Sequence, residues 1–168
     1  MENEPIRSCT QLWAWQKSKE VRRSIALLVR SWPTDERYRL ADRIIRSSRS
    51  ACANIAEGFG RYYERDNLRF CRNAKGSLYE TDHLSVAFDE RFIEKAELKR
   101  QWALCEEAIR VLNGYMKHSR KRSGENVASE PEAAYGIPVS IFMDPPDDLE
   151  ADDDLEPGAE DRASRTDN

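Results

Sequence analysis

Two runs of arginine are the residues in this chain that could do chemistry. Their members are three or four residues apart, so a helix would place each run on one face: Arg39, Arg43 and Arg46, then Arg61, Arg65, Arg69 and Arg72. Residues 37–75 hold ten Lys and Arg against four Asp and Glu. A guanidinium fork fits phosphate oxygens, and neutralising phosphates gives sequence-independent affinity. The pattern indicates binding to a nucleic-acid backbone, and the alternative is a solvated charged face.

Further basic residues extend this prediction. Lys75 follows the second arginine run by three residues, and a separate basic cluster ends the last predicted helix: Lys117, Arg120, Lys121 and Arg122. Cations at a helix C-terminus complement the helix dipole. The cluster therefore either stabilises its own helix or adds to a nucleic-acid surface.

A polar motif accompanies the first arginine run. On a helical wheel, Asn54 and Glu57 share the outward face with Arg46, opposite the apolar stripe. We interpret Asn54, Glu57 and Arg46 as an oligomer interface, in which Glu57 pairs with an arginine (Arg43 or Arg46) of a neighbouring protomer or Asn54 caps a neighbouring backbone group. The alternatives are a solvated face and, less favoured, a catalytic acid, since no His, Cys or second carboxylate shares that face.

Other reactive residues give weaker signals. No cysteine pair has CxxC spacing, which favours buried thiols over a zinc site with four thiolate ligands: Cys9, Cys52, Cys71 and Cys105. His83 and His118 lack a partner at metal or base spacing. No phosphate loop, nucleophile elbow or paired-carboxylate motif occurs. We therefore expect no catalytic residues, no metal and no cofactor.

Three aromatic residues lie near the basic segment. Phe59, Tyr62 and Tyr63 could stack on nucleic-acid bases. Aromatic residues at a turn between helices more often pack against the protein, and that is the interpretation we favour.

The residues between these motifs predict four helices. Apolar residues at spacings of three and four indicate helices over about 9–31, 35–58, 64–88 and 94–120, and no strand-like alternation appears. Trp32-Pro33 ends the first helix, and Gly58 and Gly60 end the second. Small residues occupy many inward positions: Ser48, Ala51, Cys52, Ala74 and Ser77. We predict an all-α, antiparallel up-down four-helix bundle over residues 1–123, with a thin core that favours oligomerisation.

Charge divides the 168-residue chain into two parts. Residues 1–123 hold 25 Lys and Arg against 17 Asp and Glu, whereas residues 124–168 hold 2 against 14. The second part contains repeated prolines and is predicted to be a disordered acidic tail. Its apolar segment 135–143 is either incidental or a short docking motif. The longest apolar run has five residues, Ile25–Val29, and no secretory signal is seen, so we expect a cytoplasmic protein.

Several motifs together resemble a known family. They are Leu12-Trp13-Ala14-Trp15-Gln16, Trp32-Pro33, Asn54-Ile55-Ala56-Glu57-Gly58-Phe59-Gly60-Arg61, and Phe70 followed by Ala74-Lys75-Gly76-Ser77-Leu78-Tyr79-Glu80-Thr81. In order and mutual spacing they resemble the four-helix-bundle family of 23S rRNA intervening-sequence proteins, over about residues 10–120.

The resemblance implies a homopentameric up-down bundle without established catalytic activity. The accessory variability protein of diversity-generating retroelements is similar in fold, and it is a basic pentamer that partners a reverse transcriptase and contacts nucleic acid. We therefore expect a non-enzymatic oligomer that binds RNA or DNA, with a reverse transcriptase as one candidate partner. The alternative is an interaction module whose basic face docks acidic protein segments.

Overall fold

The fold is taken from a computed structural model that describes residues 6–35, 39–81 and 83–123, with side chains as far as Lys121. Its helices are η1 (Cys9–Gln11), α1 (Trp13–Leu28), η2 (Val29–Ser31), α2 (Leu40–Phe59), α3 (Glu64–Glu80), α4 (His83–Asp89) and α5 (Lys95–Ser123), where η marks a 3-10 helix. The described residues contain no strand, so the predicted all-α class is confirmed. The predicted tail, residues 124–168, lies outside the described residues and its disorder stays a prediction.

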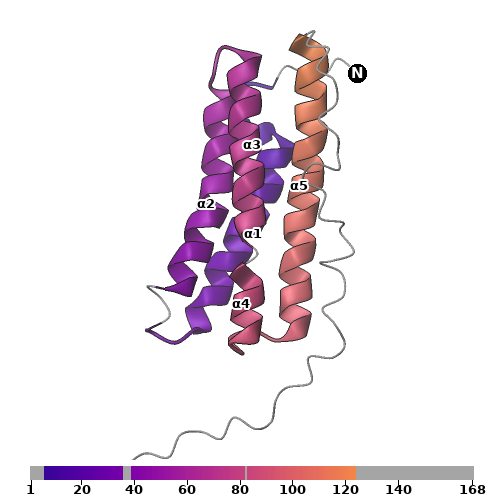
Figure 1. Ribbon diagram of the computed structural model, residues 1–168. Coiled ribbons are helices and arrows are strands. Elements are labelled where there is room, and N and C mark those ends of the chain that lie inside the picture. The colour runs from indigo at the N-terminus through magenta and orange to yellow at the C-terminus, as the bar shows by residue number, and fades with distance from the viewer. Residues whose placement is uncertain (1–5, 36–38, 82, 124–168) are drawn as a thin grey trace, which may run out of the picture. The chain divides into compact units, whose positions relative to one another are not determined.

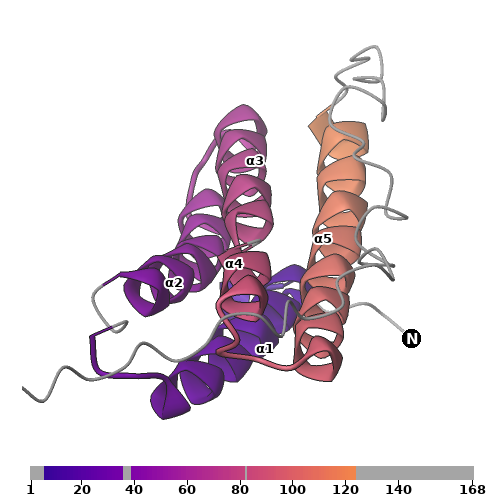
Figure 2. The ribbon, with the colours of Figure 1, turned by 60° about the horizontal axis from the view of Figure 1, so that its bottom comes forward.

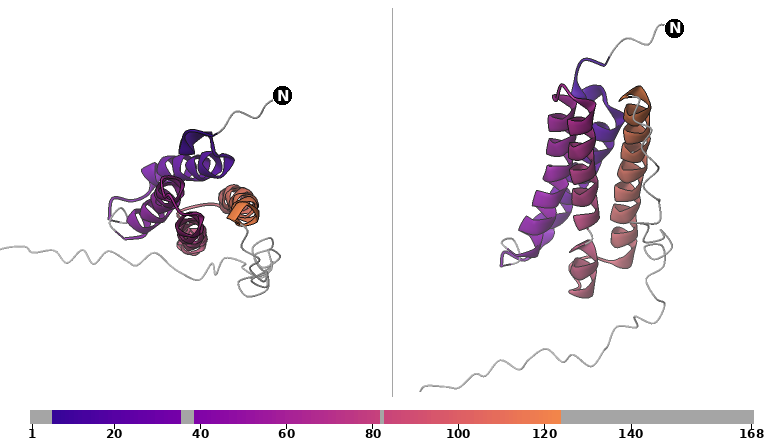
Figure 3. Two further views of the ribbon diagram at one scale, coloured as in Figure 1. Left: turned by 90° about the horizontal axis from the view of Figure 1, so that it is seen from above. Right: turned by 45° about the horizontal axis from the view of Figure 1, so that its top comes forward.

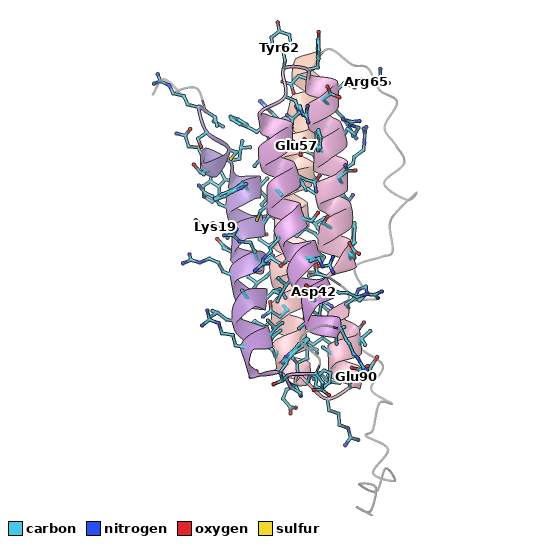
Figure 4. The ribbon with its side chains drawn as sticks, turned by 90° about the vertical axis from the view of Figure 1, so that its left-hand side faces the viewer. Lys19, Asp42, Glu57, Tyr62, Arg65 and Glu90 are labelled. Carbon is cyan, nitrogen blue, oxygen red and sulfur yellow. The ribbon has the colours of Figure 1, made fainter. Side chains whose placement is uncertain are left out.

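The helices form the predicted antiparallel bundle (Figure 1). α1 packs against α2 and α5, and α3 packs against the same two helices, so the four enclose one core. α4 continues below α3 and contacts α2 and α5 at that end (Figure 2). Seen from above, α3 and α5 are viewed nearly end-on while α1 is inclined across them (Figure 3). The outer faces of α1, α2 and α3 form one side of the bundle, which Figure 4 shows facing the viewer.

The first helix is shorter than predicted because its ends are irregular. A capping box forms the N-terminus of η1. The Ser8 side chain accepts a hydrogen bond from the Thr10 N–H, and the Gln11 side chain accepts one from the Ser8 N–H. Leu12 is extended, so α1 begins only at Trp13. At the other end Trp32 is extended, with ψ of 153°, as expected for a residue that precedes proline.

The predicted third helix is divided into α3 and α4 at Thr81. The Thr81 N–H bonds the Leu78 carbonyl at 3.3 Å, a 3-10 contact. The Thr81 hydroxyl donates to the same carbonyl. This side-chain bond competes with the α-helical ladder. Neither proline nor glycine marks the position, which is why the apolar spacing alone predicted one continuous helix.

α4 ends in a Schellman motif built on an arginine. Arg91 has a φ of 60°, in the left-handed region that glycine usually occupies. The Phe92 N–H bonds the Ala87 carbonyl at 2.8 Å, and the Arg91 N–H bonds the Phe88 carbonyl at 2.9 Å. This turn reverses the chain into α5.

The core is built from many small side chains. The five small residues predicted to lie inward are all buried. On α2 the buried face is rotated from an apolar stripe through Ile45 and Phe59, because Ile44 is buried whereas Ile45 and Phe59 are only half-buried. α2 packs against both α1 and α3, so its buried surface is wider than one apolar stripe.

Gly58 sets how closely α2 and α3 approach. A Cβ at this position would lie 3.0 Å from both Asn67 Oδ1 and Phe70 Cβ. Only glycine fits there without moving α3. The glycine in the predicted family motif therefore positions the turn that carries Arg61, Tyr62 and Tyr63.

A buried glutamine joins α1 to α5. Gln101 is fully buried, and its Nε2 donates to Ser24 Oγ and to Glu97 Oε1, both at 2.7 Å. The Nε2 of the amide is therefore hydrogen-bonded, whereas its buried Oε1 has no partner among the described residues.

Among the helices of the described residues, none is long and apolar enough to cross a membrane.

Candidate nucleic-acid interface

The arginines of α2 lie on its exposed face, as the helical wheel predicts. Arg39, Arg43 and Arg46 are all exposed. Arg46 bonds Asp42 one turn earlier, with 2.8 Å between Nε and Oδ2, and this hydrogen bond raises the pKa of the guanidinium. Arg43 Nη1 lies 3.4 Å from Nε2 of His83, whose Nδ1 is 2.9 Å from the Glu80 carbonyl. The first arginine run thus meets α4.

The second run forms an exposed line that begins at the α2–α3 turn and continues down α3. We call it the basic track: Arg61, Arg65, Arg69, Arg72 and Lys75. All except the half-buried Lys75 are exposed. Arg61 pairs with Glu57, and Arg69 lies 3.7 Å from Asp66. Arg65 has no ion-pair partner among the described residues.

A half-buried aromatic ring supports two members of the basic track. The guanidinium carbons of Arg61 and Arg69 lie 4.9 and 5.1 Å from the centroid of the Phe70 ring. Such cation–π contacts orient a guanidinium without neutralising it. Lys75 Nζ lies in the same way 5.7 Å from the Tyr79 ring. Ring contacts therefore orient three members of the track, Arg61, Arg69 and Lys75.

Side-chain hydrogen bonds connect the C-terminal end of α5 to the start of α3. Asn67 Nδ2 donates to the Tyr115 hydroxyl at 2.8 Å, and the Ser119 hydroxyl donates to Glu64 Oε2. These bonds hold the predicted basic cluster of α5 beside the α2–α3 turn. Lys117 and Lys121 are exposed and Arg120 is half-buried, whereas the side chain of Arg122 lies outside the described residues.

The predicted contact residues thus extend along the bundle rather than forming one compact patch; Figure 4 shows Arg65 near one end and Asp42, beside the first arginine run, toward the other. Arg61 and Arg65 share one end of the bundle with the α5 cluster. Arg39, Arg43 and Arg46 lie toward the other end, around Asp42, which is separated from Glu57 by roughly 22 Å of helix. The basic track runs between them along α3.

The predicted interface residues have partners within their own chain. Asn54 Nδ2 donates to the Ser50 carbonyl at 2.9 Å and to Ser50 Oγ at 3.0 Å. The Ser77 hydroxyl of α3 donates to the same Ser50 Oγ at 2.9 Å. Glu57 is half-exposed beside Arg61. Local pairing of Glu57 and Arg61 at i, i+4 spacing was visible in the sequence, but our interpretation assigned Glu57 only to a neighbouring protomer.

Basic residues of α1 were missed by the sequence analysis. Lys19 and Arg22 lie close enough to Cys52 of α2 to lower the pKa of its thiol, although burial raises that pKa more strongly. The Lys19 Nζ lies 5.0 Å from the Trp15 ring. The signal was present, because α1 carries four basic residues and a single acidic one. These side chains widen the basic side toward α1.

The opposite side of the bundle is balanced in charge. On α5, Arg100 pairs with Glu97 at 2.7 Å and Arg110 pairs with Glu107 at 2.8 Å. These bonds lower the pKa of both carboxyl groups. The basic excess of the bundle is therefore concentrated on α1, α2, α3 and the end of α5.

Tyr62 and Tyr63 do not pack into the bundle, so the favoured prediction for them is wrong. Tyr62 is 92% exposed and Tyr63 is 67% exposed, whereas Phe59 is half-buried against the core. Gly58, just before the turn, packs directly against Asn67 and Phe70 of α3.

The cysteines do not form a metal site in the described residues. All four thiols are free, and no three His, Cys, Asp or Glu side chains there gather as metal ligands. Cys52, Cys71 and Cys105 are buried. Burial raises the pKa of Cys71 to about 12 and that of Cys105 to about 11. Such thiols are poor nucleophiles at neutral pH.

Comparison with protein families settles the relationship that the motifs indicate. The family described as 23S rRNA-intervening sequence protein matches residues 10–114. The chain belongs to this family. Among curated proteins, no match to the chain is found. The match to the 23S rRNA-intervening sequence family spans α1 to most of α5, and so it contains the whole basic track.

Proposed function

We propose that this protein is a non-enzymatic, oligomeric accessory protein that holds a nucleic-acid backbone on its basic track. One observation carries the proposal: the arginines of the track are exposed together along α3, and Arg65 has no carboxylate partner among the described residues. Ion pairs with neighbours one turn away, such as Glu57 with Arg61, are weak at an exposed surface. A phosphate can displace them. The family's description, which names an rRNA element, is consistent with a nucleic-acid partner.

The test is the salt dependence of nucleic-acid binding. Removing one contact between an arginine and a phosphate should reduce the slope of log K against log salt by roughly 0.9 for duplex DNA. Replacing Arg61, Arg65, Arg69 and Arg72 with Gln should therefore lower the slope by roughly 3 to 4, equally for unrelated sequences. Fluorescence anisotropy of a labelled 25-base-pair duplex, from low to moderate salt, measures it.

A matched variant controls for the loss of positive charge. Arg100 and Arg110 lie on the balanced side of the bundle, and replacing both with Gln should leave the slope unchanged. An unchanged slope in the track variant would place the contacts elsewhere. Absence of binding by the unaltered protein at low salt would refute the proposal and favour docking of acidic protein segments.

Assembly into a ring is the second part of the proposal. The outward face of α2 carries Arg46, Ser50, Asn54 and Glu57 in the part of the chain that belongs to the family. Gly76 of α3 would add a Cβ into open space, so the protomer itself gives no reason for a glycine within that helix. Close contact with another protomer would give one. We propose a cyclic homo-oligomer, with a pentamer as the expected state.

Reversing one charge tests this interface. Glu57→Lys should weaken assembly, because it would place a cation beside Arg61 and remove the partner offered to an arginine of the next protomer. Light scattering at micromolar concentration should then give a smaller mass than for the unaltered protein. Glu107→Lys on α5 is the control and should assemble normally. A monomer mass for the unaltered protein would rule out the oligomer, and full assembly of Glu57→Lys would rule out the pairing.

A further inference from the structure

Two tyrosines project from the turn between α2 and α3. Tyr62 and Tyr63 are 92% and 67% exposed, and their rings meet edge to face with centroids 5.1 Å apart. The backbone beneath them is fixed, because the Tyr63 carbonyl accepts the Asp66 N–H at 3.0 Å and the Asn67 N–H at 3.2 Å as α3 begins. Two large rings are therefore held in solvent on a rigid support, and they make no contribution to the core.

Cations flank these rings. Arg61 and Arg65 precede and follow the tyrosines in the sequence and are exposed. The end of α5 is held against the start of α3 nearby by the Tyr115 and Ser119 hydrogen bonds. We call the residues of the turn the tyrosine end: Arg61, Tyr62, Tyr63 and Arg65. Figure 4 shows Tyr62 and Arg65 together at this end.

Three carboxylates lie near this end, and each is engaged by another side chain of the bundle. Glu57 is paired with Arg61, and Glu64 accepts the hydrogen bond from Ser119. Asp66 lies toward Arg69. A docking surface for an apolar protein segment would bury its aromatic residues in a depression with few charges at its centre. Exposed rings between two arginines suit a ligand that has both flat faces and negative charge.

We propose that the tyrosine end binds an unpaired stretch of nucleic acid, with bases stacked on Tyr62 and Tyr63 and the flanking phosphates on Arg61 and Arg65. Bases in a duplex are already stacked and do not offer their faces, whereas aromatic platforms beside cations are how proteins hold single strands. This rests on the proposed function and deepens it. The basic track holds backbone of either form, and the tyrosine end selects single-stranded segments.

The experiment compares ligands that differ only in their bases. Labelled 20-nucleotide oligothymidylate, an abasic strand with the same number of phosphates, and a 20-base-pair duplex are titrated with the full chain. The protein should bind oligothymidylate roughly 5- to 150-fold more tightly than the abasic strand for each base stacked. In Tyr62→Ala/Tyr63→Ala this preference should disappear, while affinity for the duplex and the abasic strand stays unchanged.

Two variants control for folding and for aromatic surface in general. Tyr62→Phe/Tyr63→Phe retains the rings and should keep the preference for oligothymidylate. Tyr79→Ala removes an exposed ring that supports Lys75 of the basic track, away from the turn. A change at Lys75 affects oligothymidylate and the abasic strand equally, so this variant should also keep the preference. Both tyrosines are outside the core, so thermal unfolding should be nearly the same for all variants.

The outcomes separate this inference from the proposed function. Equal binding of oligothymidylate and the abasic strand by the unaltered protein would overturn the stacking inference and leave backbone binding intact. A preference that survives in Tyr62→Ala/Tyr63→Ala would place base contacts elsewhere and also overturn it. Absence of binding to every strand at low salt would refute both.

Discussion

Removal of residues 124–168 is expected to tighten nucleic-acid binding roughly tenfold or more at low salt and to have no effect at high salt. Residues 124–168 hold 14 acidic residues against 2 basic ones and are attached directly after the basic end of α5. A tethered segment competes at an effective concentration in the millimolar range. It should act as a mimic of phosphate for Arg61, Arg65 and Lys121, and salt should screen this competition.

Two altered chains measure this effect. A chain ending at Ser123 and a full-length chain with Asn and Gln in place of the tail's Asp and Glu are titrated with the same labelled duplex at low and high salt. Both should bind more tightly than the natural chain at low salt. If only the truncated chain does so, the apolar segment 135–143 carries the inhibition rather than charge. Equal affinity of all three would make the tail a solvating appendage.

The second large effect is a loss of stability at alkaline pH. Burial raises the pKa of Cys71 to about 12 and of Cys105 to about 11. Between the pKa of an unfolded thiol, about 8.5, and these values, the folded state binds more protons than the unfolded state. Each thiol should then lower the free energy of unfolding by up to about 1.4 kcal/mol per pH unit. Below pH 8 neither thiol contributes to the pH dependence.

Urea unfolding at several pH values between 7 and 11, with a reductant present, measures this slope. The two thiols together should remove several kcal/mol by pH 11, a large part of the about 5–15 kcal/mol typical of a domain. Cys71→Ala/Cys105→Ala should have a flatter profile than the unaltered protein. Leu112→Ala, which opens a cavity but removes no titratable group, should be less stable by about 2–5 kcal/mol at every pH. A profile unchanged by the cysteine substitutions would show that the thiols do not carry the effect.

Much of the fold could be predicted from local signals. The period of apolar residues indicated the helices, Pro33 placed the end of the first, and the glycines at 58 and 60 placed the end of the second. The division at Thr81 could not be predicted in this way, because it depends on one hydroxyl bonding the Leu78 carbonyl. The rotation of the buried face of α2 was also hidden, since it depends on which two helices α2 contacts.

The candidate site was predictable in part for the same reason. The exposure of Arg65 and Arg69 follows from the helical wheel alone. The contact between the end of α5 and the start of α3 could not be predicted from the wheel, because Ser119 and Glu64, which form it, are 55 residues apart in the sequence. The 92% exposure of Tyr62 likewise could not be predicted, because an aromatic residue at a turn between helices more often packs against the protein.

The hydrogen bond between Gln101 and Ser24 has a consequence for synthesis of the chain on the ribosome. These residues are 77 positions apart, and they join the first helix to the last. At 5 to 20 residues per second, α1 waits roughly 4 to 15 seconds for α5 to emerge. During that time α2 and α3 can pair, but the side of α1 that faces α5 stays uncovered. Nascent chains that end before α5 should therefore be the species that ribosome-associated chaperones hold longest.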